Sequence, residues 1–466
     1  MSQVLLLGGD VAAFAAALDL AEVGVKVWIA DANVRVPESE VRDGGGEVAN
    51  FLTEISAPAT AGAPSNPDAA VTTVEQRGVL LRARDGAWKP VPEPSLWGIP
   101  AVPLARSCLD MLGTRGAFRA YLDRLKPVLT IGKASNFGKL VEVRLGDAVR
   151  ETTVEPLVYE RFGVAAHDAE VALVEPGLNE ALTRAGSLSG GALQQLESHV
   201  ARETVIEPLT GWQRFGDVLV EHLALYGAEI FPHGVRSCHP AASAADGGDA
   251  AAPASEQDSG WIVTDLAGGR HRFDAILGGL PEVSGAVAAA PEGALTDPVD
   301  GSPSLASLLA ANEPALTRTY VEIGIYGDGE SAPAQDDAEK LFLVAAPGGA
   351  TWAARSIAAP GGGARLRLSG PATQTGSGIE PPIAAAVSAL GVSQAAEGLV
   401  VRTGAAAFAT AVVRAGQHAA GEALAEAHGD LLVAGAPQHG GSLGAAIGEA
   451  RERAVRLRRK LTGISE

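Results

Sequence analysis

Four residues near the N-terminus have the types and spacing of a phosphate-binding turn. Gly8, Asp10 and Ala13 stand at the three glycine places of the pattern GxGxxG, and Asp31 follows where an acid is expected, about 20 residues later. In this pattern the first glycine permits a sharp turn and the second lets the backbone approach a diphosphate. The third lets the helix pack on the strand, and the acid binds a ribose. The spacing therefore indicates a dinucleotide-binding turn.

Asp10 is the anomaly in this turn. Its carboxylate would lie beside a diphosphate that already carries negative charge, and at ~5 Å with an effective dielectric constant of ~20 each charge pair costs about 3 kcal/mol. Ala13 is a tolerated replacement for the third glycine. We therefore predict that dinucleotide binding is weakened, without being certainly lost.

The segments around the turn predict the elements that would position it. The run QVLLLGGDVAAFAAALDLAEVGVKVWIADA at 3–32 predicts an apolar strand, a tight turn, an Ala-rich helix and a second strand that ends in an acid. Near the C-terminus, DLLVAGAP at 430–437 predicts a buried strand, followed by a Gly-rich turn and a helix from about Leu443 to Leu461. In a doubly wound sheet this arrangement brings two helix N-termini, with their partial positive charge, to one crevice.

Composition limits the classes of function. The 466 residues suffice for two or three domains, and the net charge of −19 disfavours a nucleic-acid or anionic-lipid partner. Cys108 and Cys238 argue against a disulfide framework, and the apolar N-terminus is broken by Asp10 and Asp19. We therefore expect a cytoplasmic protein with neither a signal peptide nor an integral membrane segment.

The rest of the chain alternates between loops and regular elements. Residues 106–200 predict mostly helices from apolar residues every three or four positions. Small, polar and Pro-rich composition predicts loops at 57–70, 238–260 and 359–380, the last interrupted by a strand at ARLRLSG. Further strands are predicted at Ile230 and Phe231, at Trp261 to Val263, and at Phe273 to Leu277. The nine scattered histidines lack the spacing of metal ligands, so no metal site is predicted.

Several longer segments together resemble one family. They are WKPVPEPSLWGIPAVPL at 88–104, the helical stretch at 137–171, GSL at 186–188, the segment at 211–237, DAILGGLP at 274–281 and LLVAGAPQHGGSLGAAIGEARERA at 431–454. In this order, and with the N-terminal unit, they resemble the flavin-dependent porphyrinogen oxidases. These are the bacterial protoporphyrinogen and coproporphyrinogen oxidases of the flavin amine oxidase superfamily.

The resemblance implies an FAD cofactor and a tetrapyrrole substrate. Enzymes of this family pass a hydride from a porphyrinogen to the flavin and the electrons on to oxygen, with little use of acid or base side chains. No catalytic residue is therefore assigned. The implied flavin contacts are Gly8, Gly9, Asp10, Val11, Ala12, Ala13, Asp31, Ala32, Val235, Phe408, Gly435, Ala436, Gly441, Ser442 and Leu443.

The departures from the family pattern concentrate at the cofactor. After Asp31 the family continues with an Arg and paired glycines and then a further strand and turn, whereas here Arg35 is followed by Val36 and Pro37. Phe408 stands where the family usually has a tryptophan. Two hypotheses follow. One is FAD-dependent oxidation of coproporphyrinogen III or protoporphyrinogen IX in heme biosynthesis, with oxygen as acceptor. The other is a flavin-free paralogue that binds a porphyrin or a protein partner.

The predicted fold class is α/β, with a Rossmann-like FAD-binding domain, a mixed-sheet substrate domain and a helical insert, as in amine oxidases. We assign residues 1–87, 203–285 and 405–466 to the FAD-binding domain, 88–202 to the insert and 286–404 to the substrate domain. The sequence leaves open a homodimer or a partner from the heme pathway.

Overall fold

The fold was analysed in a computed structural model of the chain. It describes residues 2–37, 40–59, 64–75, 77–127, 134–241, 260–279, 305, 313–326, 338–358, 364–374, 380–392, 394–395 and 398–463. The chain divides into two compact units. Unit 1 comprises Met1–Val74, Thr204–Pro314 and Ala415–Glu466, and unit 2 comprises Glu75–Glu203 and Ala315–Arg414.

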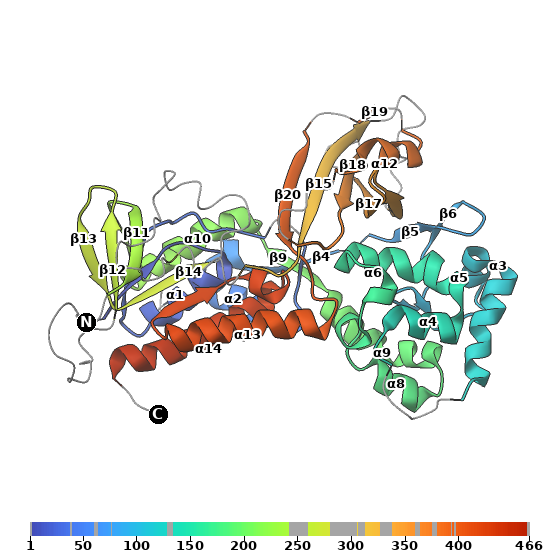
Figure 1. Ribbon diagram of the computed structural model, residues 1–466, viewed down its shortest axis with the longest axis horizontal. Helices are drawn as coiled ribbons and strands as arrows, with labels where there is room; N and C mark the ends of the chain where they lie inside the picture. The colour runs from blue at the N-terminus through green and yellow to red at the C-terminus, as the bar shows by residue number, and fades with distance from the viewer. Residues whose placement is uncertain are drawn as a thin grey trace. The chain divides into compact units, whose positions relative to one another are not determined.

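Unit 1 is built on a parallel sheet of five strands. In spatial order these are β10 (Glu229–Ile230), β2 (Lys26–Ile29), β1 (Gln3–Leu6), β14 (Ala275–Gly279) and β21 (Leu431–Ala434). Figure 1 labels β14. Val4 and Leu6 of β1 face one apolar core and Leu5 faces another. Because both faces are covered, the strand is a continuous apolar run, as is typical of parallel sheets.

Helices cover one face of this sheet. They are α1 (Val11–Ala21), α2 (Glu47–Ser56), α10 (Trp212–Leu225) and α14 (Leu443–Thr462). Arg451 of α14 joins three of these helices, since its guanidinium lies 2.9 Å from Asp19 Oδ1 on α1 and 2.7 Å from Glu54 Oε2 on α2. The small alanine side chains of α1 let it lie close to α14.

The other face packs on a second sheet and on one helix. The sheet is antiparallel and consists of β11 (Val235–Pro240), β12 (Trp261–Asp265) and β13 (Arg270–Phe273). Helix α13 (Ala411–Ala427) reaches the same core through Leu424. A small sheet of β3 (Val41–Arg42), β9 (Val205–Pro208) and β4 (Val71–Val74), with the short helices η1 (Pro67–Ala69) and η8 (Ala436–His439), completes the described part of unit 1.

Unit 2 combines a large mixed sheet with a helical layer. The sheet contains β5 (Val79–Arg82), β6 (Trp88–Pro90), β15 (Thr317–Tyr326), β16 (Glu339–Ala345), β17 (Thr351–Ala358), β18 (Ala364–Ser369), β19 (Gln394–Ala395) and β20 (Val400–Ala405). β16 pairs with β5 in parallel, whereas its pairing with β17 is antiparallel. A short hairpin of β7 (Ser95–Leu96) and β8 (Ile99–Pro100) lies beside the helices.

The helical layer of unit 2 comes mostly from residues 106–203 and shares one apolar core. Its members are α3 (Arg106–Tyr121), η2 (Leu122–Leu125), α4 (Phe137–Leu145), α5 (Asp147–Val149), the π-helix η3 (Arg150–Val154), α6 (Glu155–Phe162), η4 (Ala166–Asp168), α7 (Val171–Val174), α8 (Leu178–Ala185) and α9 (Leu188–Glu203). A further helix, α12 (Ile383–Ala389), packs in the core of the mixed sheet.

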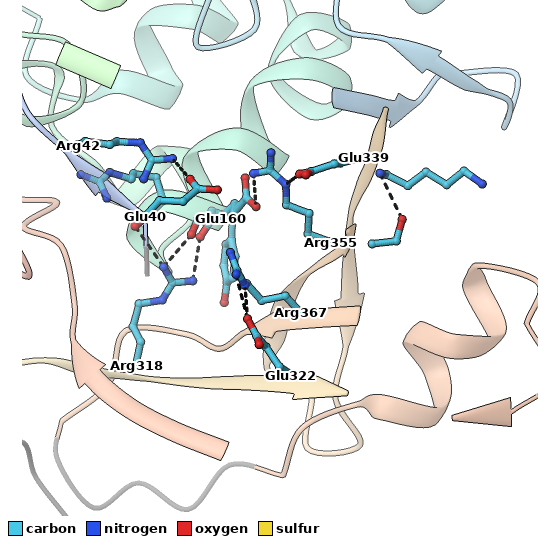
Figure 2. Close-up of polar contacts among 12 residues, drawn as sticks. Glu40, Arg42, Glu160, Arg318, Glu322, Glu339, Arg355 and Arg367 are labelled. Carbon is cyan, nitrogen blue, oxygen red and sulfur yellow. Dashed lines mark hydrogen bonds and ion pairs between the residues drawn. The ribbon is translucent and has the colours of Figure 1, made fainter. Parts of the chain in front are cut away.

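A buried arginine joins the helical layer of unit 2 to its sheet (Figure 2). Arg318 on β15 is 1% exposed, and its guanidinium donates to the carbonyls of Tyr159, Glu160 and Arg161 and to that of Gly370, which follows β18, at 2.8–3.2 Å. The first three carbonyls belong to the last turn of α6, where carbonyls carry partial negative charge, and that of Tyr159 also accepts a bond from the Gly163 N–H at 2.8 Å. Arg318 therefore caps this helix from the sheet.

The structure confirms most of the expected elements. The strand–turn–helix segments at both ends of the chain are present, residues 106–200 are mainly helical, ARLRLSG contains a strand, and Cys108 and Cys238 are free thiols. Three-residue helix η1 replaces part of the loop expected at 57–70. Residues 242–259, 359–363 and 375–379 of the other two expected loops lie outside the described residues.

One expected strand is wrong in its bounds. Phe273 to Leu277 is interrupted at Asp274, which separates β13 from β14. The Asp274 carboxylate accepts a hydrogen bond from the Gln3 backbone N–H at 2.7 Å, so this residue starts the pairing of β14 with β1. The continuous apolar pattern concealed the change of sheet.

The assignment of roles to three domains stays a prediction. Most of the range expected as a helical insert and the described part of the range expected as a substrate domain belong to unit 2. Among the described residues, no helix is long and apolar enough to cross a membrane.

Replacing Arg318 by Met should destabilise the protein. The substitution leaves buried carbonyls without a donor, at about 1–3 kcal/mol for each group that water does not reach. We expect the free energy of unfolding, measured by urea denaturation, to fall by about 3 kcal/mol. Arg365→Met, at an exposed position of neighbouring strand β18, is the control and should change it by about 0.5 kcal/mol or less. Equal losses in the two variants would contradict the capping role.

Candidate functional site

The turn between β1 and α1 is built from closely packed backbone. Gly8 and Gly9 have φ angles of 120° and 154°, which disfavour side chains. A Cβ on Gly9 would lie 2.6 Å from Ala13 Cβ and 2.9 Å from the Gly279 nitrogen. Ala13 thus performs the packing expected of the third place in the pattern, and the end of β14 touches the turn.

Asp10 caps helix α1 with its own side chain. Its Oδ1 accepts a hydrogen bond from the Ala12 N–H at 3.0 Å, in the first turn of the helix. Its Oδ2 accepts a second bond from the Ala436 N–H at 2.7 Å, in the turn after β21. These donors belong to the two turns where the sequence predicts contacts to a dinucleotide. The carboxyl group therefore uses N–H groups that a diphosphate would need.

Arg35 lies against the same turn. Its backbone N–H donates to the Gly9 carbonyl at 2.9 Å, and a Cβ on Gly279 would lie 2.6 Å from its Nη2. The other terminal nitrogen, Nη1, is buried and has no hydrogen-bond partner among the described residues. The segment after β2 therefore crosses the glycine turn and brings a positive charge to Asp10.

Burial and the neighbouring groups act in opposite directions on the pKa of Asp10. Burial raises the pKa of this carboxyl, while the hydrogen bond from Ala436, the Arg35 guanidinium and the bond from Ala12 lower it. Since burial is the largest effect, the carboxyl retains its proton at higher pH than a free aspartic acid does. A diphosphate that entered this turn would therefore meet N–H groups that already have an acceptor, as well as the acid noted in the sequence.

An exposed carboxylate lies where the sequence predicts contact with a ribose. Asp31 lies two residues after the end of β2 and is exposed. It lies beside Gly8, because a Cβ on Gly8 would be 3.1 Å from Asp31 Cβ. Its Oδ1 accepts a hydrogen bond from the Asn33 N–H at 2.9 Å. The adjacent Ala32 is half-buried, and Val235, at the start of β11, packs against the same apolar cluster as Leu7. An exposed carboxylate at this place is what a ribose hydroxyl would require.

The C-terminal turn is also ordered by its own residues. Gly435 precedes η8, and a Cβ there would lie 3.2 Å from Asp10 Oδ2. Gly441 has a φ of 81°, and the Ser442 side chain caps α14 by accepting from the Ala445 N–H at 3.4 Å. Leu443 is buried. The turn therefore holds its conformation through internal hydrogen bonds.

The structure brings most of the predicted residues together, with one exception. Gly8 to Ala13, Asp31, Ala32, Val235, Gly435, Ala436, Gly441, Ser442 and Leu443 all belong to unit 1. Phe408 lies half-buried in unit 2, between β20 and α13. The sequence alone did not point to Gly279 or to the pairing of Arg35 with Asp10; the paired glycines within DAILGGLP were the available signal for the first.

One cluster of acids lies elsewhere in unit 1. Asp19, Glu22 and Glu54 place carboxylate oxygens within 4.8 Å of one another, and burial raises the pKa of Asp19. Arg451 forms ion pairs with Asp19 and Glu54. The arginine thus supplies the positive charge that these two acids require.

The residues at the turn fit a ribose but not a diphosphate. Asp31 beside Gly8 suits a ribose, whereas the N–H groups of Ala12 and Ala436 already bind the Asp10 carboxyl. Gly9 and Gly279 leave no room for a Cβ between them. In the described conformation a diphosphate could enter only by displacing Asp10.

The comparisons with known proteins show the fold. No family model matches the chain, and no curated protein matches it in sequence. A protein from Exiguobacterium sp. 255-15 assigned as a protoporphyrinogen oxidase is similar with a TM-score of 0.65 and 14% identity, over 98% of this chain and 99% of that one. These values confirm, at the level of fold, the resemblance stated from the sequence.

Two further solved structures have the same architecture. Reduced UDP-galactopyranose mutase gives a TM-score of 0.57 at 10% identity, over 100% of this chain and 97% of that one. Cyclohexylamine oxidase from Brevibacterium oxydans IH-35A gives 0.50 at 11% identity, over 99% of each chain. The predicted fold class, an amine-oxidase-like α/β fold with a mixed sheet, is confirmed.

Gly279→Ala should disrupt the turn, whereas Gly278→Ala should not. The new Cβ at 279 would lie 2.6 Å from both Gly9 Cα and Arg35 Nη2, but at 278 it would meet only Leu7 side-chain atoms at 3.8 Å. We expect a loss of about 1–3 kcal/mol for the first variant and less than about 0.5 kcal/mol for the second, measured by urea denaturation. Two variants of equal stability would show that the contact at Gly279 is dispensable.

The stability that Asp10 contributes should depend on pH. Because its folded-state pKa is raised, its contribution is fully present below the usual value of about 3.9 and is lost as pH rises through the folded-state pKa. The difference in unfolding free energy between the wild type and Asp10→Asn should therefore decrease as the pH is raised above about 4. Urea titrations at fixed pH steps measure it. A difference that grows over this range would indicate a lowered pKa.

Proposed function

We propose that the chain is a binding protein with the fold of the flavin amine oxidases that works without FAD. The observation that carries this proposal is the Asp10 carboxyl, which is bound to the Ala12 and Ala436 N–H groups. This function corresponds to the flavin-free hypothesis of the sequence analysis. It accounts for the departures from the family pattern, which also concentrate at this place.

A diphosphate could bind at this turn only by exchanging its hydrogen bonds for those of Asp10. A helix N-terminus binds phosphate because its N–H groups would otherwise lack partners inside the protein. Here a diphosphate would replace bonds that Asp10 already makes, each worth about 1.5–3 kcal/mol when its acceptor is charged. Since about 1.4 kcal/mol is a factor of ten in affinity, losing the gain from two such bonds lowers affinity at least about a hundredfold.

The proposed ligand class is a tetrapyrrole of the porphyrin type. Its support is the order of sequence segments shared with porphyrinogen oxidases and the similarity to a protein assigned as a protoporphyrinogen oxidase. A protein partner is the other occupant considered for such a scaffold. We place the protein in the cytoplasm.

A second function is favoured by the ribose end of the site. Asp31 remains exposed beside Gly8, as a bound dinucleotide would require. On this reading the protein is an FAD-dependent oxidase of coproporphyrinogen III or protoporphyrinogen IX, with oxygen as acceptor. Binding of FAD would then require Asp10 to leave its position.

The purified full-length protein should be colourless and should not take up FAD. Absorbance after incubation with FAD and gel filtration measures retained flavin, and quenching of tryptophan fluorescence by coproporphyrin III measures tetrapyrrole binding. We expect that no flavin is retained and that coproporphyrin III quenches the tryptophan fluorescence in a saturable way.

The outcomes separate the two functions. Retained flavin would overturn the flavin-free proposal and support the oxidase. A colourless protein without saturable quenching would overturn the tetrapyrrole assignment. Albumin, which binds porphyrins, serves as the positive control for the fluorescence measurement.

A further inference from the structure

We infer that Asp10 performs the structural role of a dinucleotide diphosphate, holding together the first and the last turn of unit 1. This inference rests on the proposed flavin-free function and extends it. It assigns to one side chain the stabilisation that a bound cofactor supplies elsewhere. It also predicts which class of anion the site would accept once that side chain is removed.

The two N–H groups that donate to Asp10 come from distant parts of the chain. Ala12 belongs to the first turn of α1, and Ala436 lies 426 positions after Asp10, in the turn that follows β21. Both are backbone N–H groups at the carboxyl ends of parallel strands, where dinucleotides bind in sheets of this type. One carboxyl group with two oxygen acceptors satisfies one donor from each end.

Three glycines lie around Asp10. Gly435 lies so close that a Cβ would be 3.2 Å from Asp10 Oδ2, and Gly9 and Gly279 touch each other. A diphosphate needs bare backbone in this way, so that its oxygens can approach the N–H groups. Here the same lack of side chains at the glycines lets the carboxyl group of Asp10, which is shorter than a diphosphate, reach the N–H groups of Ala12 and Ala436.

The positive charge of Arg35 also acts on Asp10. Arg35 attracts the ionised form of Asp10, while its Nη1 is buried without a partner among the described residues. A buried guanidinium nitrogen without an acceptor is costly. An anion larger than a carboxyl group, with more oxygens, could supply that acceptor. The site therefore combines two backbone donors with a guanidinium, which is a donor set for phosphate.

Removal of the carboxyl should destabilise unit 1 and create a site for phosphate anions. Asp10→Ala deletes both hydrogen bonds and leaves the N–H groups and Arg35 in place. The matched control is Asp43→Ala in the same unit, because Asp43 also accepts from two backbone N–H groups, those of Val48 at 3.1 Å and Ala49 at 2.9 Å. Asp43 caps α2, away from the β1–α1 turn in the chain.

The experiment measures the Tm of the full-length protein by calorimetry, with and without ADP or inorganic pyrophosphate. We expect both variants to unfold about 3–6 °C below the wild type. ADP and pyrophosphate should raise the Tm of Asp10→Ala by at least about 2 °C and leave Asp43→Ala and the wild type unchanged. ADP acting alone would indicate that the nucleoside is also recognised, and supports the inference.

Several results would overturn it. An unchanged Tm for Asp10→Ala would show that the carboxyl does not hold the turns. Equal responses to the anions in Asp10→Ala and Asp43→Ala would show that no new site forms. If Asp10→Ala does not fold, Asp10→Asn replaces it, since its single amide oxygen cannot serve both donors. Hydrogen exchange should then quicken in the peptide that contains Ala436 but not in the one that contains Ala49, and unchanged exchange at Ala436 overturns the inference.

Failure of the inference is distinguishable from failure of the proposed function. Flavin retained by the wild type overturns the proposed function, whatever the variants do. A colourless wild type with an unaffected Asp10→Ala variant overturns only the structural role of Asp10.

Discussion

The carboxyl group of Asp10 accepts hydrogen bonds from the N-terminal and the C-terminal segments of unit 1 and thereby joins them. A buried backbone N–H needs an acceptor, and the turns after β1 and β21 each direct one N–H to the same place. In dinucleotide-binding folds a phosphate oxygen meets this requirement. Here the Asp10 side chain meets it, so the N-terminal and C-terminal segments are joined without a ligand.

Burial and Arg35 affect the charge of the Asp10 carboxyl in opposite directions. Burial opposes the charge of Asp10, and the positive guanidinium of Arg35 moderates that penalty. The backbone N–H of Arg35 donates to the Gly9 carbonyl, and this bond holds the residue against the turn. Unit 2 uses a comparable device, in which Arg318 satisfies the carbonyls at the end of α6.

Local sequence patterns were sufficient for the elements and insufficient for the site. The Ala-rich run of α1 and the apolar runs of β1 and β21 predicted their structure because burial on both faces leaves a continuous pattern. The spacing of Gly8, Asp10 and Asp31 located the turn. No local pattern could indicate that Oδ2 of Asp10 meets a donor 426 positions away. The break at Asp274 was hidden for the same reason, since its partner Gln3 is distant in the chain.

The contact between Gly9 and Gly279 bears on how such glycines are interpreted in general. Both positions exclude a Cβ because the backbones touch, irrespective of any bound molecule. Packing alone therefore accounts for both glycines, and their presence does not establish that a nucleotide binds. What such a turn can bind depends instead on whether its N–H groups already have acceptors within the protein.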